Sequence, residues 1–222
     1  MTLKTTKTKI RLDGHWNLQE LSEAMKDYIH LYGFTYSLLL NLPTARRAEV
    51  EYIYGKFPWR GGFSTVNFFS QLFSKIPPKL RPEIKRIRYA SPGFIELQEL
   101  SAAAVEIAKI VTAVCVSLNM AHGLYRKIQK GSVAHKLAKI DVASKELELT
   151  QRQLTFCTEQ ANNLIKLFNL STGQIATLQE RTQGNAVMKL KILLSVYRRV
   201  EPLATKQFEG KIQLTTETNE KT

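Results

Sequence analysis

Apolar residues recur every three or four positions along the middle of the chain. The series starts at Leu97, passes through Val111 and Leu118, and ends at Ile128 without a break over about four heptads. This spacing places the apolar side chains along one side of a helix. The pattern therefore predicts one long helix that begins at Leu97 and is capped at its end by Gly131.

A weaker series of the same period follows from Val133 to Phe168, and Ser132 is suited to cap its first turn. A connection of only two residues makes two long helices antiparallel neighbours. We therefore expect a long antiparallel helical hairpin over residues 97–169. Three polar residues interrupt the second apolar stripe, which indicates either a loosely packed middle or a third element that covers it.

Apolar and polar residues alternate strictly near the N-terminus, which is typical of a half-buried strand. Within residues 6–12 the alternation puts Ile10 and Leu12 on one face, and Lys9 and Arg11 on the other. The Asp-Gly pair that follows closes the segment as a turn. The pattern predicts a first strand here.

Two further strands are predicted at residues 83–89 and 94–97, on either side of a Ser-Pro-Gly turn. The first is mixed on both faces, as expected for an exposed edge strand whose basic side chains discourage unwanted pairing. Strict alternation gives Ile84, Arg86 and Arg88 on one face, and Lys85, Ile87 and Tyr89 on the other. With residues 6–12, these segments predict a small antiparallel sheet.

Other helices are predicted on both sides of these elements. Asn17, followed three residues later by Glu20, forms a capping box that opens a helix, which stops or kinks at Gly33. Residues 44–54 fit a helix or a strand equally well. A last apolar helix ends near Pro202.

These elements predict an α+β fold that is mostly α-helical, with a long antiparallel helical hairpin and a small antiparallel sheet. Residues 1–97 form an N-terminal α/β part. Residues 98–203 hold the hairpin and the C-terminal helices and are continuous with it. Residues 204–222 are predicted to be a flexible tail.

The chain has 222 residues, of which 44% are hydrophobic, and a net charge of +13. It can therefore bury a sizeable core, and its charge favours an anionic partner. The excess of basic residues is spread evenly along the sequence. The densest cluster comprises Lys79, Arg81, Lys85, Arg86 and Arg88. This cluster is the candidate site for contacts with nucleic-acid phosphates.

A second candidate site is the stretch "RGGFS". Arg60 precedes Gly61 and Gly62, and Ser64 is placed to cap a helix. Free backbone amides, a helix dipole and an arginine together suit a phosphate or a carboxylate. The alternative is a tight turn followed by an ordinary helix cap.

No arrangement of residues predicts an enzyme, a metal site or a cofactor. The four histidines lack zinc-site spacing, and no nucleotide-binding or nucleophile-elbow motif occurs. Cys115 and Cys157 lie in apolar helical segments, far from any CxxC spacing. We expect both to be buried free thiols in a reducing compartment, which predicts a cytoplasmic protein.

A transmembrane span is not expected. Residues 110–125 carry no charge but are shorter than the roughly 20 residues that a spanning helix needs. A helix buried in the protein core is the preferred interpretation. Self-association and peripheral membrane contact are alternatives, because Val105, Ile110 and Val116 lie off the main stripe and also need cover.

Three functions follow from these features, in order of preference. The first is a non-enzymatic interaction or accessory protein that uses helical surfaces for self-association or for docking a protein partner. The second is a basic nucleic-acid-binding protein that contacts phosphates through residues 79–88. The third is an enzyme that binds a small anion near residues 60–64.

Overall fold

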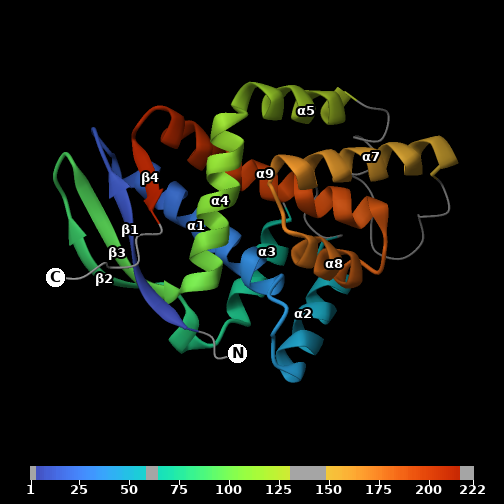
Figure 1. The fold of residues 1–222 in the computed structure, drawn as a ribbon, viewed down its shortest axis with the longest axis horizontal. Coiled ribbons are helices and arrows are strands. Elements are labelled where there is room, and N and C mark those ends of the chain that lie inside the picture. The colour runs from blue at the N-terminus through green and yellow to red at the C-terminus, as the bar shows by residue number, and fades with distance from the viewer. Residues whose placement is uncertain (1–3, 59–64, 131–148, 216–222) are drawn as a thin grey trace.

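The structure, a computed structural model, describes residues 4–58, 65–130 and 149–215. Helices dominate it, and an antiparallel sheet lies at one end (Figure 1), which confirms the predicted α+β, mostly helical class. The helices are α1 (Leu18–Ser37), α2 (Thr44–Lys56), α3 (Val66–Ser74), η1 (Pro78–Leu80, a 3-10 turn), α4 (Ser101–Val116), α5 (Leu118–Lys130), α7 (Gln151–Leu167), α8 (Thr172–Arg181) and α9 (Ala186–Phe208). The strands are β1 (Thr5–Leu12), β2 (Glu83–Arg88), β3 (Gly93–Leu100) and β4 (Ile212–Thr215).

The sheet has the strand order β2-β3-β1-β4, and neighbouring strands are antiparallel. The three predicted strands are confirmed, and the fourth corrects the prediction of a flexible tail over residues 204–222. Instead α9 continues to Phe208, and Gly210, at a φ of 75°, reverses the chain into β4. Ile212 is then buried beside β1. Residues 216–222 lie outside the described residues.

α1 begins at the predicted capping box, in which the Asn17 side chain accepts a hydrogen bond from the Glu20 amide at 2.8 Å. The helix does not stop or kink at Gly33. It continues for another turn because Gly33 lies against α3, where a Cβ atom would be only 2.9 Å from the Phe73 backbone nitrogen. The glycine therefore serves close helix packing and not a helix end. The ambiguous residues 44–54 lie within α2.

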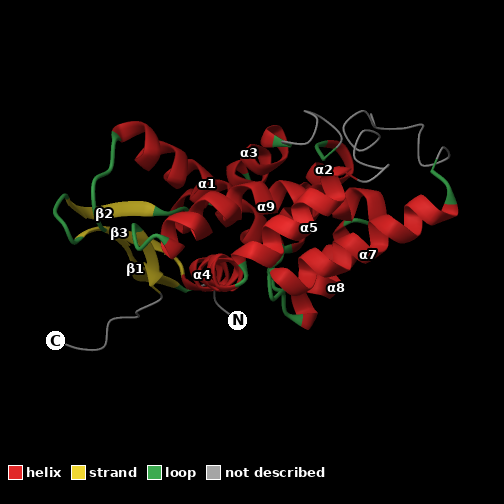
Figure 2. Cartoon of the chain, turned by 90° about the horizontal axis from the view of Figure 1, so that it is seen from above, coloured by secondary structure: helices red, strands yellow, loops and turns green. Residues whose placement is uncertain are grey.

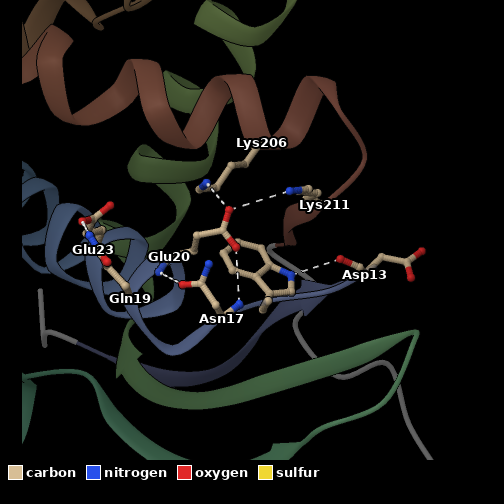
Figure 3. A network of polar contacts seen from close by, with 8 residues as sticks. Asp13, Asn17, Gln19, Glu20, Glu23, Lys206 and Lys211 are labelled. Atoms are coloured by element: carbon tan, nitrogen blue, oxygen red, sulfur yellow. Dashed lines mark hydrogen bonds and ion pairs between the residues drawn. The ribbon is translucent and has the colours of Figure 1, made fainter.

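A polar network joins the turn between β1 and α1 to the turn between α9 and β4 (Figure 3). The Trp16 indole N–H donates to the Asp13 carbonyl oxygen at 3.0 Å. The Glu20 carboxylate lies 4.0 Å from the Lys206 ammonium and 3.8 Å from that of Lys211. The Lys206 ammonium also lies over the Trp16 ring, 5.5 Å from its centroid. These contacts hold the sheet against the ends of the two central helices.

The central apolar series forms two helices and not one. The residues up to Leu100 belong to β3, where pairing with β1 fixes them, so α4 begins only at Ser101. The helix then breaks at Ser117, and α5 leaves at 88° to α4. After this bend α5 runs beside α7 and also contacts α9 (Figure 1), and its Ala121 and Ile128 are buried.

The second arm of the predicted hairpin is described only in part. Residues 131–148, which include the predicted connection and the first half of that arm, lie outside the described residues. The remainder is α7, which opens at a capping box of Thr150 and Gln153. α7 packs on α9 and also contacts α5. Of the two alternatives for the interrupted stripe, a covering third element fits the described part, because α9 packs against α7.

The core is centred where α1, α4 and α9 pack together. Phe34, Ile107 and Leu194, one from each helix, are almost completely buried. No single helix in the described part of the chain is both long and apolar enough to cross a membrane. α4 and α5 taken together pass that test of length and composition, but they are a sharply bent pair.

Two buried hydroxyl groups tie α1 to the sheet. Tyr28 donates to the Glu99 carboxylate at 2.8 Å, which also accepts a hydrogen bond from Thr8. Burial raises the pKa of Glu99, because desolvation disfavours its charged form. The Tyr32 hydroxyl donates to the Leu80 carbonyl at 2.7 Å and accepts from the Leu100 amide at 2.7 Å.

A buried arginine joins α9 to α1 and α3. The Arg199 guanidinium lies 3.9 Å from the centroid of the Phe69 ring and donates to the Ser195 carbonyl at 2.7 Å. Its Nε also donates to Nδ1 of His30 at 3.1 Å. Nδ1 of His30 therefore carries no proton. Burial lowers the pKa of His30 to about 4, and the nearby positive charge of Arg199 contributes to this shift.

His30 should make the protein less stable in mild acid. The unfolded chain binds a proton to His30 near pH 6.5 and the folded chain only near pH 4, so stability is lost as the pH falls through this window. As the pH is lowered, we expect the free energy of unfolding of the native protein to fall relative to that of the His30→Gln variant. Glutamine keeps a hydrogen-bond acceptor for Arg199 but does not titrate. Urea unfolding at pH 7, 5.5 and 4.5 measures this difference, and a difference that stays constant would contradict the prediction.

Candidate nucleic-acid interface

The two central strands of the sheet separate a buried face from an open one. Ile95 and Leu97 of β3, and Ile10 and Leu12 of β1, are buried against the helices. The helices gather on this side of the sheet (Figure 2). The opposite side, which we call the outer face, carries the alternate residues of each strand.

The cross-strand register sets one row of the outer face as arginine, phenylalanine, arginine. Phe94 of β3 is the Cα partner of Arg88 on β2 and of Arg11 on β1. Both arginines are exposed, and Phe94 is partly exposed between them. The Lys9 ammonium lies 5.5 Å from the centroid of the Phe94 ring. One cation thus lies over the aromatic ring, and an arginine stands on the neighbouring strand on each side of it.

The next row has a carboxylate in its centre. Glu96 of β3 is the Cα partner of Arg86 on β2 and of Lys9 on β1. Its carboxylate is 3.8 Å from the Lys7 ammonium, which is itself 53% exposed. Cations therefore stand on both sides of Glu96. Glu83 of β2, the Cα partner of Gln98 on β3, adds a second carboxylate to this face, and the cations of β1 and β2 still outnumber the carboxylates.

A β-bulge decides which side chains of β2 reach the outer face. Strict alternation predicted two mixed faces, but the register shifts between Ile84 and Arg86, so Lys85 is the extra residue. After the shift, Arg86 and Arg88 share the outer face, while Ile84 and Ile87 share the face on the helix side. The expected mixing is therefore wrong, because one inserted residue sorts the basic and apolar side chains onto opposite faces.

Arg81 of the predicted basic cluster has a structural role. Its guanidinium donates to the carbonyl oxygens of Ile76 at 2.9 Å and Ser74 at 2.8 Å, at the C-terminal end of α3. It also lies over the Phe73 ring, 5.5 Å from the centroid. These contacts cap the helix end, so Arg81 is committed to the fold.

Of the other four members of the cluster, two lie off the outer face and two lie on it. Lys79 is exposed on η1, outside the sheet. Lys85 occupies the bulge, and its ammonium lies 2.8 Å from the Glu83 carboxylate. Only Arg86 and Arg88 of the predicted cluster lie on the outer face.

Three basic residues of the interface come from the first strand and were not among the predicted site residues. They are Lys7, Lys9 and Arg11. Alternation in the sequence had already placed Lys9 and Arg11 on the polar face of β1. Alternation does not show which strand pairs with β1. The pairing with β3 brings the polar face of β1 beside residues some 80 positions away.

The predicted phosphate site at Arg60, Gly61, Gly62 and Ser64 lies outside the described residues. Among the residues that are described, no group of three or more His, Cys, Asp or Glu side chains could hold a metal ion. Burial raises the pKa of the Cys157 thiol to about 11, so this cysteine is protonated at neutral pH. Comparisons with protein-family models, curated proteins and solved structures found no match for the chain.

Proposed function

We propose that this protein binds single-stranded nucleic acid across the outer face of its sheet. The observation that carries the proposal is the row in which Phe94 stands between Arg11 and Arg88. An aromatic ring can stack on a base of any sequence, while flanking arginines contact the phosphates on either side. This combination of stacking and charge is what a single strand requires.

The charge of the whole outer face supports the same partner. Five cationic side chains, on β1 and β2, share this face with two carboxylates, those of Glu96 and Glu83. The face belongs to a sheet, and in the described part of the chain no helix projects from it to enter a major groove. A basic sheet surface with a partly exposed ring favours a single strand over a duplex.

The packing gives less support to the first function considered above, an interaction protein that uses helical surfaces for self-association or docking. Of the three apolar residues that needed cover, Ile110 is buried in the core and Val105 is half-buried. Only Val116, at the corner between α4 and α5, is strongly exposed, at 84%. The apolar surfaces that suggested helical self-association are thus largely covered within this fold.

The proposal is tested first by titrating the protein into fluorescently labelled single-stranded DNA and RNA of about 12 nucleotides. Binding should weaken steeply with salt, with a slope of log K against log salt near −3 if four or five phosphates are contacted. A duplex of the same sequence should bind more weakly. Binding that is weak and independent of salt at about 50 mM would contradict the proposal.

Charge reversal separates the outer face from the general charge of the protein. Lys9→Glu with Arg11→Glu should weaken single-strand binding at least about tenfold and reduce the salt slope by about 1.4. The matched control is Arg47→Glu with Arg152→Glu, which makes the same change in net charge on exposed positions of α2 and α7. An equal loss of affinity in the control would show that binding is not confined to the outer face.

Phe94 distinguishes stacking from general polyanion binding. Phe94→Ala should weaken single-strand binding about tenfold, in line with the loss of one base–aromatic stack. Heparin, which has no bases, should bind the variant as it binds the native protein. An equal loss for heparin and for DNA would remove stacking from the proposal.

A further inference from the structure

The outer edge of β2 has no partner strand in the described part of the chain. β2 is the last strand of the sheet and pairs only with β3 (Figure 1). All six of its residues are exposed. A row of backbone N–H and C=O groups on such an edge can accept another extended chain.

An apolar shelf lies beside this edge, on the helix side of the sheet. Ile84 and Ile87 are each 57% exposed, whereas their Cα partners on β3, Leu97 and Ile95, are 4% and 2% exposed. The cover that the helices give to β3 therefore ends before it reaches β2. Two isoleucines are left where one further strand could bury them.

We infer that β2 is a docking edge for an extended acidic segment of a protein partner, which adds a fifth strand to the sheet. Alternate residues of such a strand fall on opposite faces. Apolar residues would cover Ile84 and Ile87, and acidic residues would lie beside Arg86 and Arg88. Among the described residues neither of these two arginines forms an ion pair, so both are available for carboxylates.

Charge complementarity identifies the occupant of this edge. A second copy of the chain, paired through β2, would bring Arg86 and Arg88 of one molecule beside the same residues of the other. Like charges on adjacent strands are destabilising. The same charges that protect the edge from other copies are compatible with an acidic strand, because its carboxylates would neutralise them.

The test uses labelled peptides of about ten residues, a length that spans β2. The probe alternates valine and glutamate, and two counterparts alternate valine with lysine and serine with glutamate. The first peptide should bind saturably and slow amide hydrogen exchange within β2. Each counterpart should bind at least about tenfold more weakly, because it lacks either the charge or the apolar face.

Two variants locate the contact. Ile84→Ser with Ile87→Ser should weaken binding of the valine–glutamate peptide about tenfold by removing the shelf. Arg86→Glu with Arg88→Glu should reverse the preference, so that the valine–lysine peptide binds better. Both sites are exposed, and an unchanged melting temperature would confirm that each variant is folded.

The variant Lys9→Glu with Arg11→Glu keeps this inference separate from nucleic-acid binding. It should bind the peptide as the native protein does, because β1 does not border the edge, and should bind single-stranded nucleic acid at least about tenfold more weakly. The inference is overturned if bound peptide leaves the amides of β2 unprotected, or if the native protein dimerises through β2. It is also overturned if the two isoleucines are needed for binding to anionic phosphatidylserine vesicles and not for binding the peptide.

Discussion

Replacing Gly33 with alanine is expected to lower the free energy of unfolding by about 2 kcal/mol, although alanine is the better helix former by about 1 kcal/mol. The added Cβ atom would lie 2.9 Å from the Phe73 backbone nitrogen and 3.3 Å from the Phe69 carbonyl oxygen. Both are backbone atoms of α3, so no side chain can rotate to relieve the contact. α1 and α3 must move apart, which disturbs the buried aromatic residues between them.

The chain contains a matched control for this prediction. Gly55 is also helical, in α2, and a Cβ atom there would meet no atom within 4 Å. Gly55→Ala should therefore raise the free energy of unfolding by up to about 1 kcal/mol. Urea unfolding of the two variants should give changes of opposite sign. A neutral or stabilising Gly33→Ala would show that α1 and α3 do not pack as closely as described.

Replacing Tyr32 with phenylalanine should lower the free energy of unfolding by about 3 kcal/mol, since it removes one oxygen atom that serves two buried groups. The Tyr32 hydroxyl donates to the Leu80 carbonyl and accepts from the Leu100 amide, both at 2.7 Å. Tyr32 itself is fully buried. The ring of the variant would fit, but both backbone groups would lose this partner in a site that water does not reach.

Tyr89 provides the control for the loss of a tyrosine hydroxyl. It is 81% exposed in the β2–β3 hairpin, so Tyr89→Phe should change the free energy of unfolding by less than about 0.5 kcal/mol. Thermal unfolding of both variants against the native protein would measure the contrast. Similar melting temperatures for the two would mean that the Tyr32 hydroxyl contributes little to holding β3 and η1 on α1.

Local patterns were enough to predict the elements whose ends are set by nearby residues. Asn17 and Glu20 form the capping box that their spacing indicated. The first strand and the hairpin of β2 and β3 lie where alternation and turn residues predicted them. The capping box and the hairpin join residues close together in sequence, and the alternation of β1 is likewise a pattern within one short segment.

Patterns with more than one local solution were settled by distant contacts. Gly33 is an ordinary signal for a helix end, but it lies inside α1 because α3 packs against it. The chain bends at Ser117 within a periodicity that is continuous in sequence, and α5 then packs on α7 and α9. The tail after α9 forms β4 because β1 offers a strand to pair with.

The sequence alone therefore determined the fold class, the basic character and the exposed, basic nature of β2. Only the tertiary structure decided which basic residues lie together on one face. The pairing of β1 with β3 brought Lys9 and Arg11 to the row of Phe94, and the bulge at Lys85 moved Arg86 and Arg88 to that face. Register and bulges depend on hydrogen bonds between strands far apart in sequence, which periodicity within one segment does not record.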